Sequence, residues 1–62
     1  MKRNQLIKHL TKNGCVLDRE GCNHSIFYNP KINKTTAVPR HTEIKNTICN
    51  EICKQLGIDK IK

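Results

Sequence analysis

Apolar residues recur at helical spacing near the start of the chain. Residues 3–12 place Leu6, Ile7 and Leu10 along one side of a helix, with basic residues on the opposite side. Gly14 follows shortly afterwards, and glycine readily takes the left-handed conformation that ends a helix. The pattern predicts a first amphipathic helix over residues 3–12.

A second apolar stripe lies near the other end of the chain. It repeats every fourth residue and consists of Ile48, Ile52 and Leu56. Gly57 follows as a helix stop, and Asn46 or Thr47 is the expected N-cap because both side chains accept hydrogen bonds from free backbone N–H groups. The segment predicts a second amphipathic helix, and residues 58–62 are expected to form a fraying tail.

Three short segments between the predicted helices have the composition of strands. They span Cys15 to Arg19, Ser25 to Tyr28 and Thr35 to Val38. Pro30 and Pro39 follow the second and third segments, and proline has no N–H to donate to a strand ladder. Connections as short as the loop at residues 31–34 cannot join parallel strands, so we expect an antiparallel meander.

The predicted order is α-β-β-β-α, an α+β fold. Residues 1–62 are expected to form one domain, because a chain of this length cannot build a second hydrophobic core. Two amphipathic helices and a sheet with one apolar face pack most economically with both helices on that face. The other face of the sheet is then left open to solvent or to a partner.

The charge balance narrows the choice of partner. Twelve Lys and Arg face five Asp and Glu, which gives a formal net charge of +7. The basic residues are spread along the chain, as is typical of a folded domain with a cationic face, and such a face favours nucleic acid or an acidic protein. No signal peptide and no apolar run long enough to cross a membrane is visible, so we expect a cytoplasmic protein.

Four cysteines stand at positions 15, 22, 49 and 53. Disulfides are not expected in a cytosolic chain, and structural zinc sites usually show tighter pairs than these. We therefore expect Cys15, Cys49 and Cys53 to fill the core as small apolar side chains. A zinc site that joins cysteines with His24 or His41 is the minority alternative. The five acidic residues are scattered singly, so a two-metal nuclease is not expected either.

Three histidines are candidates for acid–base chemistry, because imidazole titrates near neutral pH. His9 lies on the first predicted helix and is expected at the surface. His41 follows the third strand, in a loop suited to contact a ligand. His24 begins the second strand after Gly21, where the backbone has room to approach a phosphate.

Alternation along the second strand predicts which side chains accompany His24. Ile26 and Tyr28 share its face of the sheet, whereas Ser25 and Phe27 point the other way. Phe27 is expected to pack against the helices because it is the largest purely apolar side chain. His24 is then expected on the open face, beside Tyr28.

Four segments of the chain together match a known family. They are Lys12-Asn13-Gly14-Cys15-Val16, Gly21-x-Asn23-His24-Ser25-Ile26-Phe27-Tyr28-Asn29-Pro30, Val38-Pro39-Arg40-His41-x-Glu43-Ile44 and Cys53-Lys54-Gln55-Leu56-Gly57. In this order they resemble the HicA-type (YcfA-like) mRNA interferase toxins, whose fold is the α-β-β-β-α of double-stranded-RNA-binding domains. Members often carry a second glycine where this chain has Cys22, and a cysteine there narrows the backbone conformations available before His24.

The resemblance implies the toxin of a type II toxin–antitoxin system, an endoribonuclease that cleaves mRNA and is silenced by a HicB-type antitoxin. Its catalytic histidine corresponds to His24. No cofactor is expected. We expect a monomer when alone and a hetero-oligomer with the antitoxin. The residues expected to contact RNA are Tyr28, Lys31, Lys34, Arg40 and His41.

The predicted mechanism is metal-independent, with His24 as general acid/base. His24 takes the proton of a 2′-hydroxyl, whose oxygen attacks the adjacent phosphorus and expels the 5′-oxygen. A proton or positive charge on the leaving oxygen comes from His41, Arg40 or Lys31, which the sequence does not rank. Two alternatives stay open: a non-catalytic RNA-binding module of the same fold, and a zinc-stabilised interaction domain.

Overall fold

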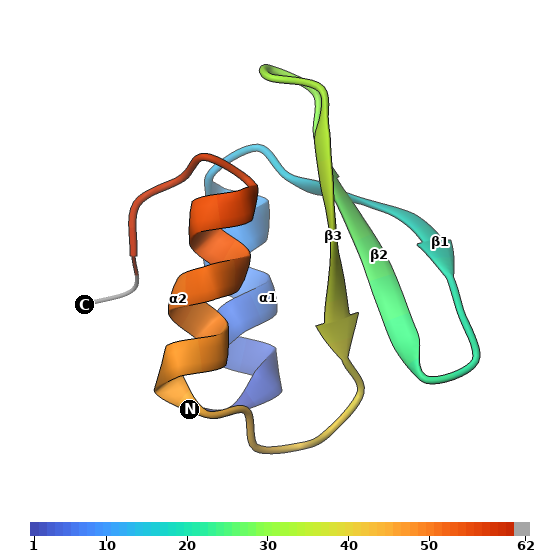
Figure 1. Ribbon diagram of the computed structural model, residues 1–62, viewed down its shortest axis with the longest axis vertical. Coiled ribbons are helices and arrows are strands. Elements are labelled where there is room, and N and C mark those ends of the chain that lie inside the picture. The colour runs from blue at the N-terminus through green and yellow to red at the C-terminus, as the bar shows by residue number, and fades with distance from the viewer. Residues whose placement is uncertain (61–62) are drawn as a thin grey trace.

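The computed structural model describes residues 1–60, with the element order α-β-β-β-α (Figure 1). The elements are helix α1 (Arg3–Lys12), strands β1 (Val16–Glu20), β2 (His24–Asn29) and β3 (Lys34–Pro39), and helix α2 (Asn46–Gln55). The predicted α+β class and element order are confirmed. No helix within residues 1–60 is long and apolar enough to cross a membrane.

The three strands form one antiparallel sheet in the order β1-β2-β3, which confirms the predicted meander. β2 is the central strand, with His24 opposite Pro39 at one end and Asn29 opposite Lys34 at the other. The register between β1 and β2 shifts between Leu17 and Arg19. Such a bulge bends an edge strand and increases its twist.

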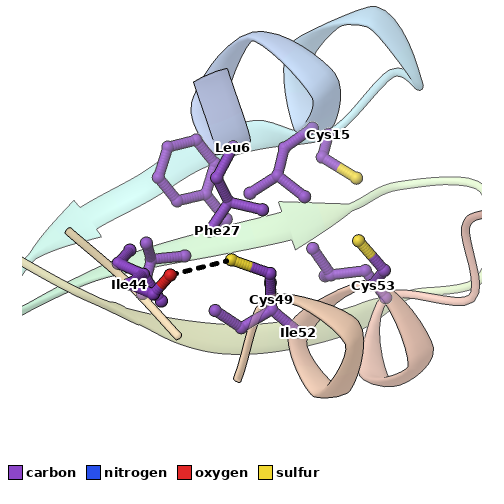
Figure 2. Packing of buried hydrophobic residues seen from close by; sticks show 10 residues of the cluster. Leu6, Cys15, Phe27, Ile44, Cys49, Ile52 and Cys53 are labelled. Atoms are coloured by element: carbon purple, nitrogen blue, oxygen red, sulfur yellow. Dashed lines mark hydrogen bonds between the residues drawn. The ribbon is translucent and has the colours of Figure 1, made fainter. Parts of the chain in front are cut away.

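Both helices cover the same face of the sheet, as predicted (Figure 1). Ten buried side chains form the core between these layers, and Figure 2 shows them from close by. They are Leu6, Leu10, Cys15, Phe27, Val38, Ile44, Cys49, Ile52, Cys53 and Leu56. Three cysteines and Phe27 therefore fill the core as expected, whereas Cys22 is exposed.

The helices do not extend over β1. All five of its residues are exposed, and the side chains of Val16 and Leu17 are 51% and 50% accessible. Figure 1 places β1 on the side of the sheet farthest from the helices. The covered face therefore belongs to β2 and β3, whose alternate residues are buried.

Helix α2 differs from its prediction in two details. Ile48 is 40% exposed, because residues 49, 52, 53 and 56 form the buried stripe at i, i+3, i+4 and i+7 spacing and position 48 lies beside it. The predicted N-cap is also wrong. Lys45 occupies that position without a side-chain cap hydrogen bond, and Asn46 is the first helical residue.

The segment after α2 is docked against the core. Gly57 has φ +67°, and Ile58, which is partly buried against the core, donates its N–H to the Cys53 carbonyl at 3.0 Å. His9 donates Nε2–H to the Asp59 carbonyl at 2.6 Å. The expected fraying tail is therefore wrong for residues 58 and 59, and its last two positions, 61 and 62, lie outside the described residues.

The tip of the β2–β3 hairpin is tied to the C-terminal end of α2. Asn29, which is 3% exposed, donates from its side-chain amide to the Leu56 carbonyl at 2.7 Å. Its Oδ1 accepts the Lys31 N–H at 3.1 Å. Ile32 lies over Gly57, where an added Cβ would stand 2.5 Å from the isoleucine Cδ1. These contacts fix the position of the hairpin turn relative to the C-terminal end of α2.

Candidate active site

His24 is the first residue of β2, and its side chain is exposed on the open face. Ser25 and Phe27 are buried on the other face, while Ile26 and Tyr28 are partly exposed beside His24. The predicted alternation is confirmed. Strand geometry alone thus directs the imidazole away from the helices, into a position that a substrate can reach.

The turn before His24 is closed by a short backbone contact. Gly21 donates its N–H to the His24 carbonyl at 2.7 Å, and an added Cβ on Gly21 would stand 3.0 Å from that oxygen. Glycine therefore suits this close approach, because a larger residue at position 21 would require the turn to shift. Within residues 1–60 a positive φ occurs at Gly14, Asn33 and Gly57. Cys22 accordingly has a backbone conformation open to any residue, and it fits the turn.

A cavity of about 370 Å³ lies over this turn and the end of β3. Its lining residues are Cys22, Asn23, His24, Arg40 and His41. We call it the histidine pocket. It brings together His24 and two further predicted site residues, Arg40 and His41, from the connector that follows β3. An imidazole pair and a guanidinium at one opening form a set of groups suited to proton transfer beside an anion.

Arg40 is held in place by an ion pair with Glu20. Glu20 is the last residue of β1, so the pair joins the edge strand to the connector after β3. Both side chains are partly exposed, at 41% and 52%. Exposed ion pairs contribute little to stability, so an anionic ligand can compete with Glu20 for the guanidinium.

Arg3, the first residue of α1, supports the site from behind the sheet. Its Nε–H donates to the Pro39 carbonyl at 3.0 Å, and its Nη2 donates to Ser25 Oγ at 2.9 Å. Ser25 follows His24, and Pro39 is paired with His24 across the sheet. Arg3 therefore fixes both strands at the point where His24 is displayed. No sequence pattern predicts the contact between Arg3 and Ser25, because the two residues are 22 positions apart in the chain.

The remaining predicted RNA contacts lie at the other end of the hairpin. Lys34 is paired with Asn29, five residues from His24 along β2, which corresponds to roughly 17 Å at the usual rise per residue. Lys31 lies in the turn, and Tyr28 donates its hydroxyl proton to Asn33 Oδ1 at 2.7 Å. The predicted set of six thus separates into a histidine group and a hairpin group.

Two thiols and one carboxyl group have pKa values shifted from their ordinary range. Burial raises the pKa of the thiols of Cys15 and Cys49, which keeps both protonated and apolar. A hydrogen bond from Lys2, supported by the Met1 ammonium group, lowers the pKa of Glu43. Within residues 1–60, no group of three or more His, Cys, Asp or Glu side chains is arranged to hold a metal ion.

Comparison with known families gives a match over almost the whole chain. The family model described as "HicA toxin of bacterial toxin-antitoxin" matches residues 3–58 of the 62. This range contains both helices, all three strands and every residue of the histidine pocket. No significant match was found among curated proteins or among solved structures.

Proposed function

Because the chain belongs to the HicA family of toxins from bacterial toxin–antitoxin systems, we propose that it is an mRNA-cleaving endoribonuclease that acts at the histidine pocket. One observation carries this proposal: the fold gathers His24, Arg40 and His41, from two separate segments, around one open cavity. These side chains supply the proton acceptor, the proton donor and the positive charge that cleavage of RNA by its own 2′-hydroxyl needs.

In the proposed reaction His24 acts as the general base. It takes the proton of a 2′-hydroxyl, and the oxygen attacks the adjacent phosphorus to form a 2′,3′-cyclic phosphate. The P–O bond to the 5′-oxygen breaks, and His41 protonates that oxygen as it leaves. Arg40 neutralises the charge that develops on the phosphoryl oxygens.

The side chains of the pocket support a metal-independent route. None of its five lining residues carries a carboxylate, the group that usually holds Mg²⁺ beside a phosphate. The two imidazoles and the guanidinium are instead the groups that move protons and bind phosphate directly. The pocket therefore provides acid, base and charge from its own residues.

As a toxin of a toxin–antitoxin system, the chain pairs with an antitoxin. We place a HicB-type antitoxin on the open face of the sheet, over the histidine pocket. This face presents partly exposed Ile26 and Tyr28 and exposed Val16, which supply an apolar centre for an interface. An acidic segment of the partner complements the net charge of +7 and competes with RNA for Arg40.

Cleavage of a defined RNA in excess EDTA tests the catalytic role. We expect wild type to cleave, and His24→Ala to lose about 10²–10⁴-fold in kcat. His9→Gln is the matched control, since His9 lies outside the pocket and contacts Asp59. The end groups of the products, identified by mass spectrometry, should be 2′,3′-cyclic phosphate and 5′-hydroxyl.

Three results would contradict parts of this proposal. Equal cleavage by wild type and His24→Ala excludes His24 as the base. Cleavage that stops in EDTA excludes the metal-independent route. RNA binding without cleavage by the wild-type protein favours the non-catalytic module instead.

A further inference from the structure

We infer that a second cavity beside the histidine pocket binds the neighbouring phosphate of a single-stranded RNA, an inference that rests on the proposed function. This cavity measures about 230 Å³ and is called the flanking cavity here. It is lined by Lys2, Arg3, Asn4, Arg40 and Thr42. Arg40 also lines the histidine pocket, so the two cavities adjoin at this residue.

The flanking cavity is held rigidly next to the histidine pocket. Arg3 donates its backbone N–H to the Thr42 carbonyl at 2.8 Å, and Lys2 forms a β-bridge with Glu43. These contacts join the start of the chain to the connector that carries Arg40. Figure 1 shows the N-terminus and this connector at the same end of the molecule. The two cavities therefore keep a defined spacing without a partner.

The lining of the flanking cavity matches an anion. Three of its five residues are cationic, and none is a carboxylate. The Arg3 guanidinium is bonded to Pro39 and Ser25, so Lys2 and Arg40 are the cations that can turn to a ligand. Lys2 does pair with Glu43 at 3.3 Å, but these side chains are 66% and 61% exposed. Exposed pairs are weak, and a phosphate that displaces Glu43 also gains from the release of counterions. Each RNA phosphodiester carries one negative charge, which the cations of the cavity can neutralise.

The same lining favours RNA over a protein partner. All five residues are polar, so the cavity offers no apolar anchor of the kind that dominates protein interfaces. Because Arg40 lines both cavities, groups bound in the two cavities lie close to one another. Successive phosphates of a nucleic acid suit two such adjoining sites, with the cleaved phosphate in the histidine pocket and the next one in the flanking cavity.

The test compares substrates that differ by one phosphate. A dinucleoside monophosphate contains only the phosphate that is cleaved, whereas trinucleotides add one phosphate on its 5′ or its 3′ side. A 2′-O-methyl group on the ribose next to the added phosphate protects that phosphate from cleavage. For each protein we take the ratio of kcat/KM between a trinucleotide and the dinucleotide. We expect Lys2→Gln to lower this ratio roughly threefold to tenfold for one of the two trinucleotides. The slope of log(kcat/KM) against log salt concentration for that trinucleotide should become shallower by about 0.7.

Two control variants separate phosphate binding from folding and from overall charge. Lys12→Gln makes the same charge change at the far end of α1 and should keep the wild-type ratio. Glu43→Gln breaks the same ion pair as Lys2→Gln but retains the lysine, so its ratio should equal or exceed that of wild type. Thermal unfolding of each variant confirms the folded fraction.

Three outcomes would overturn the inference. In the first, Lys2→Gln and Lys12→Gln have the same ratio. In the second, Glu43→Gln lowers the ratio as much as Lys2→Gln does. In the third, Lys2→Gln weakens binding of the antitoxin but leaves the ratio unchanged, which assigns the cavity to the protein partner.

The flanking cavity can be tested even if the protein does not cleave RNA. If wild type cleaves none of these substrates, binding of a 2′-O-methyl RNA oligonucleotide replaces cleavage as the readout. Weaker binding by Lys2→Gln than by Lys12→Gln then supports the flanking cavity. Equal binding by the two variants contradicts it.

Discussion

The two ends of strand β2 are held by different kinds of contact. At the Asn29 end, a side chain that is 3% exposed bonds both to Leu56 at the end of α2 and to the turn of its own hairpin. At the His24 end, the strand is fixed from behind by Arg3, while His24 itself stays exposed. One end is closed by buried bonds and the other presents exposed groups to a ligand.

Under the proposed function, we expect this difference to separate stability from activity along a single strand. Buried polar bonds such as those of Asn29 are costly to break, because the remaining partner is left without water. The exposed Arg40 is paired weakly enough with Glu20 to exchange this partner for a phosphate. We therefore expect substitutions at the Asn29 end to lower stability and substitutions at the His24 end to lower activity.

Asn29→Ala should have the largest effect on stability. It leaves the Leu56 carbonyl and the Lys31 N–H without their partner, at a cost of about 2–3 kcal/mol. Chemical denaturation measures this loss. The kcat of the folded fraction should stay close to that of wild type. A large drop in kcat at full folding would contradict the proposed separation of the two ends.

Arg3→Met should affect both properties. Loss of two hydrogen bonds to Pro39 and Ser25 should cost about 1–2 kcal/mol, and the looser position of His24 should lower kcat about tenfold. Arg3→Lys should not restore kcat, because a lysine ammonium group does not reproduce the geometry of the two guanidinium hydrogen bonds to Pro39 and Ser25. Ser25→Ala removes one of the two bonds and should show a smaller loss. An unchanged kcat in Arg3→Met would show that the clamp does not position His24.

Arg40→Gln should lower kcat/KM more than Lys34→Gln does. Arg40 lines the histidine pocket, whereas Lys34 lies at the opposite end of the hairpin. We expect kcat/KM to fall roughly tenfold for Arg40→Gln and about two- to threefold for Lys34→Gln. The loss for Lys34→Gln should be accompanied by a shallower dependence of kcat/KM on salt concentration. Glu20→Gln is the matched control, since it breaks the ion pair but keeps Arg40. Equal losses for Arg40→Gln and Lys34→Gln would place the RNA along the whole hairpin.

The smallest effect is expected from the acid titration of Glu43. Its pKa is lowered in the folded protein by Lys2, so the ion pair stabilises the fold above the ordinary carboxyl pKa of about 4.3. That contribution is lost as the pH falls through the lowered folded-state value. The difference in melting temperature between wild type and Glu43→Gln should therefore be present at pH 7 and shrink as the pH falls from the ordinary carboxyl pKa through the lowered folded-state value. A constant difference would exclude this titration.

Much of the fold could be predicted from local patterns. The limits of α1, the antiparallel meander and the exposed side of β2 follow from apolar spacing, prolines and alternation. The prediction for α2 was less accurate because its buried stripe contains two cysteines, which hydrophobic spacing alone does not rank above Ile48. The docking of Ile58 was missed because it depends on a surface made by other elements.

The residues of this sequence by themselves determined the element order, the class of fold and the exposed position of His24. Each follows from neighbours within a few positions, since helical and strand periodicity are local properties. Only the tertiary structure decided that Arg40 and His41, but not Lys31 or Lys34, share a pocket with His24. It also decided that Arg3 of α1 donates a hydrogen bond to Ser25 of β2, because such contacts join residues that no spacing in the sequence relates.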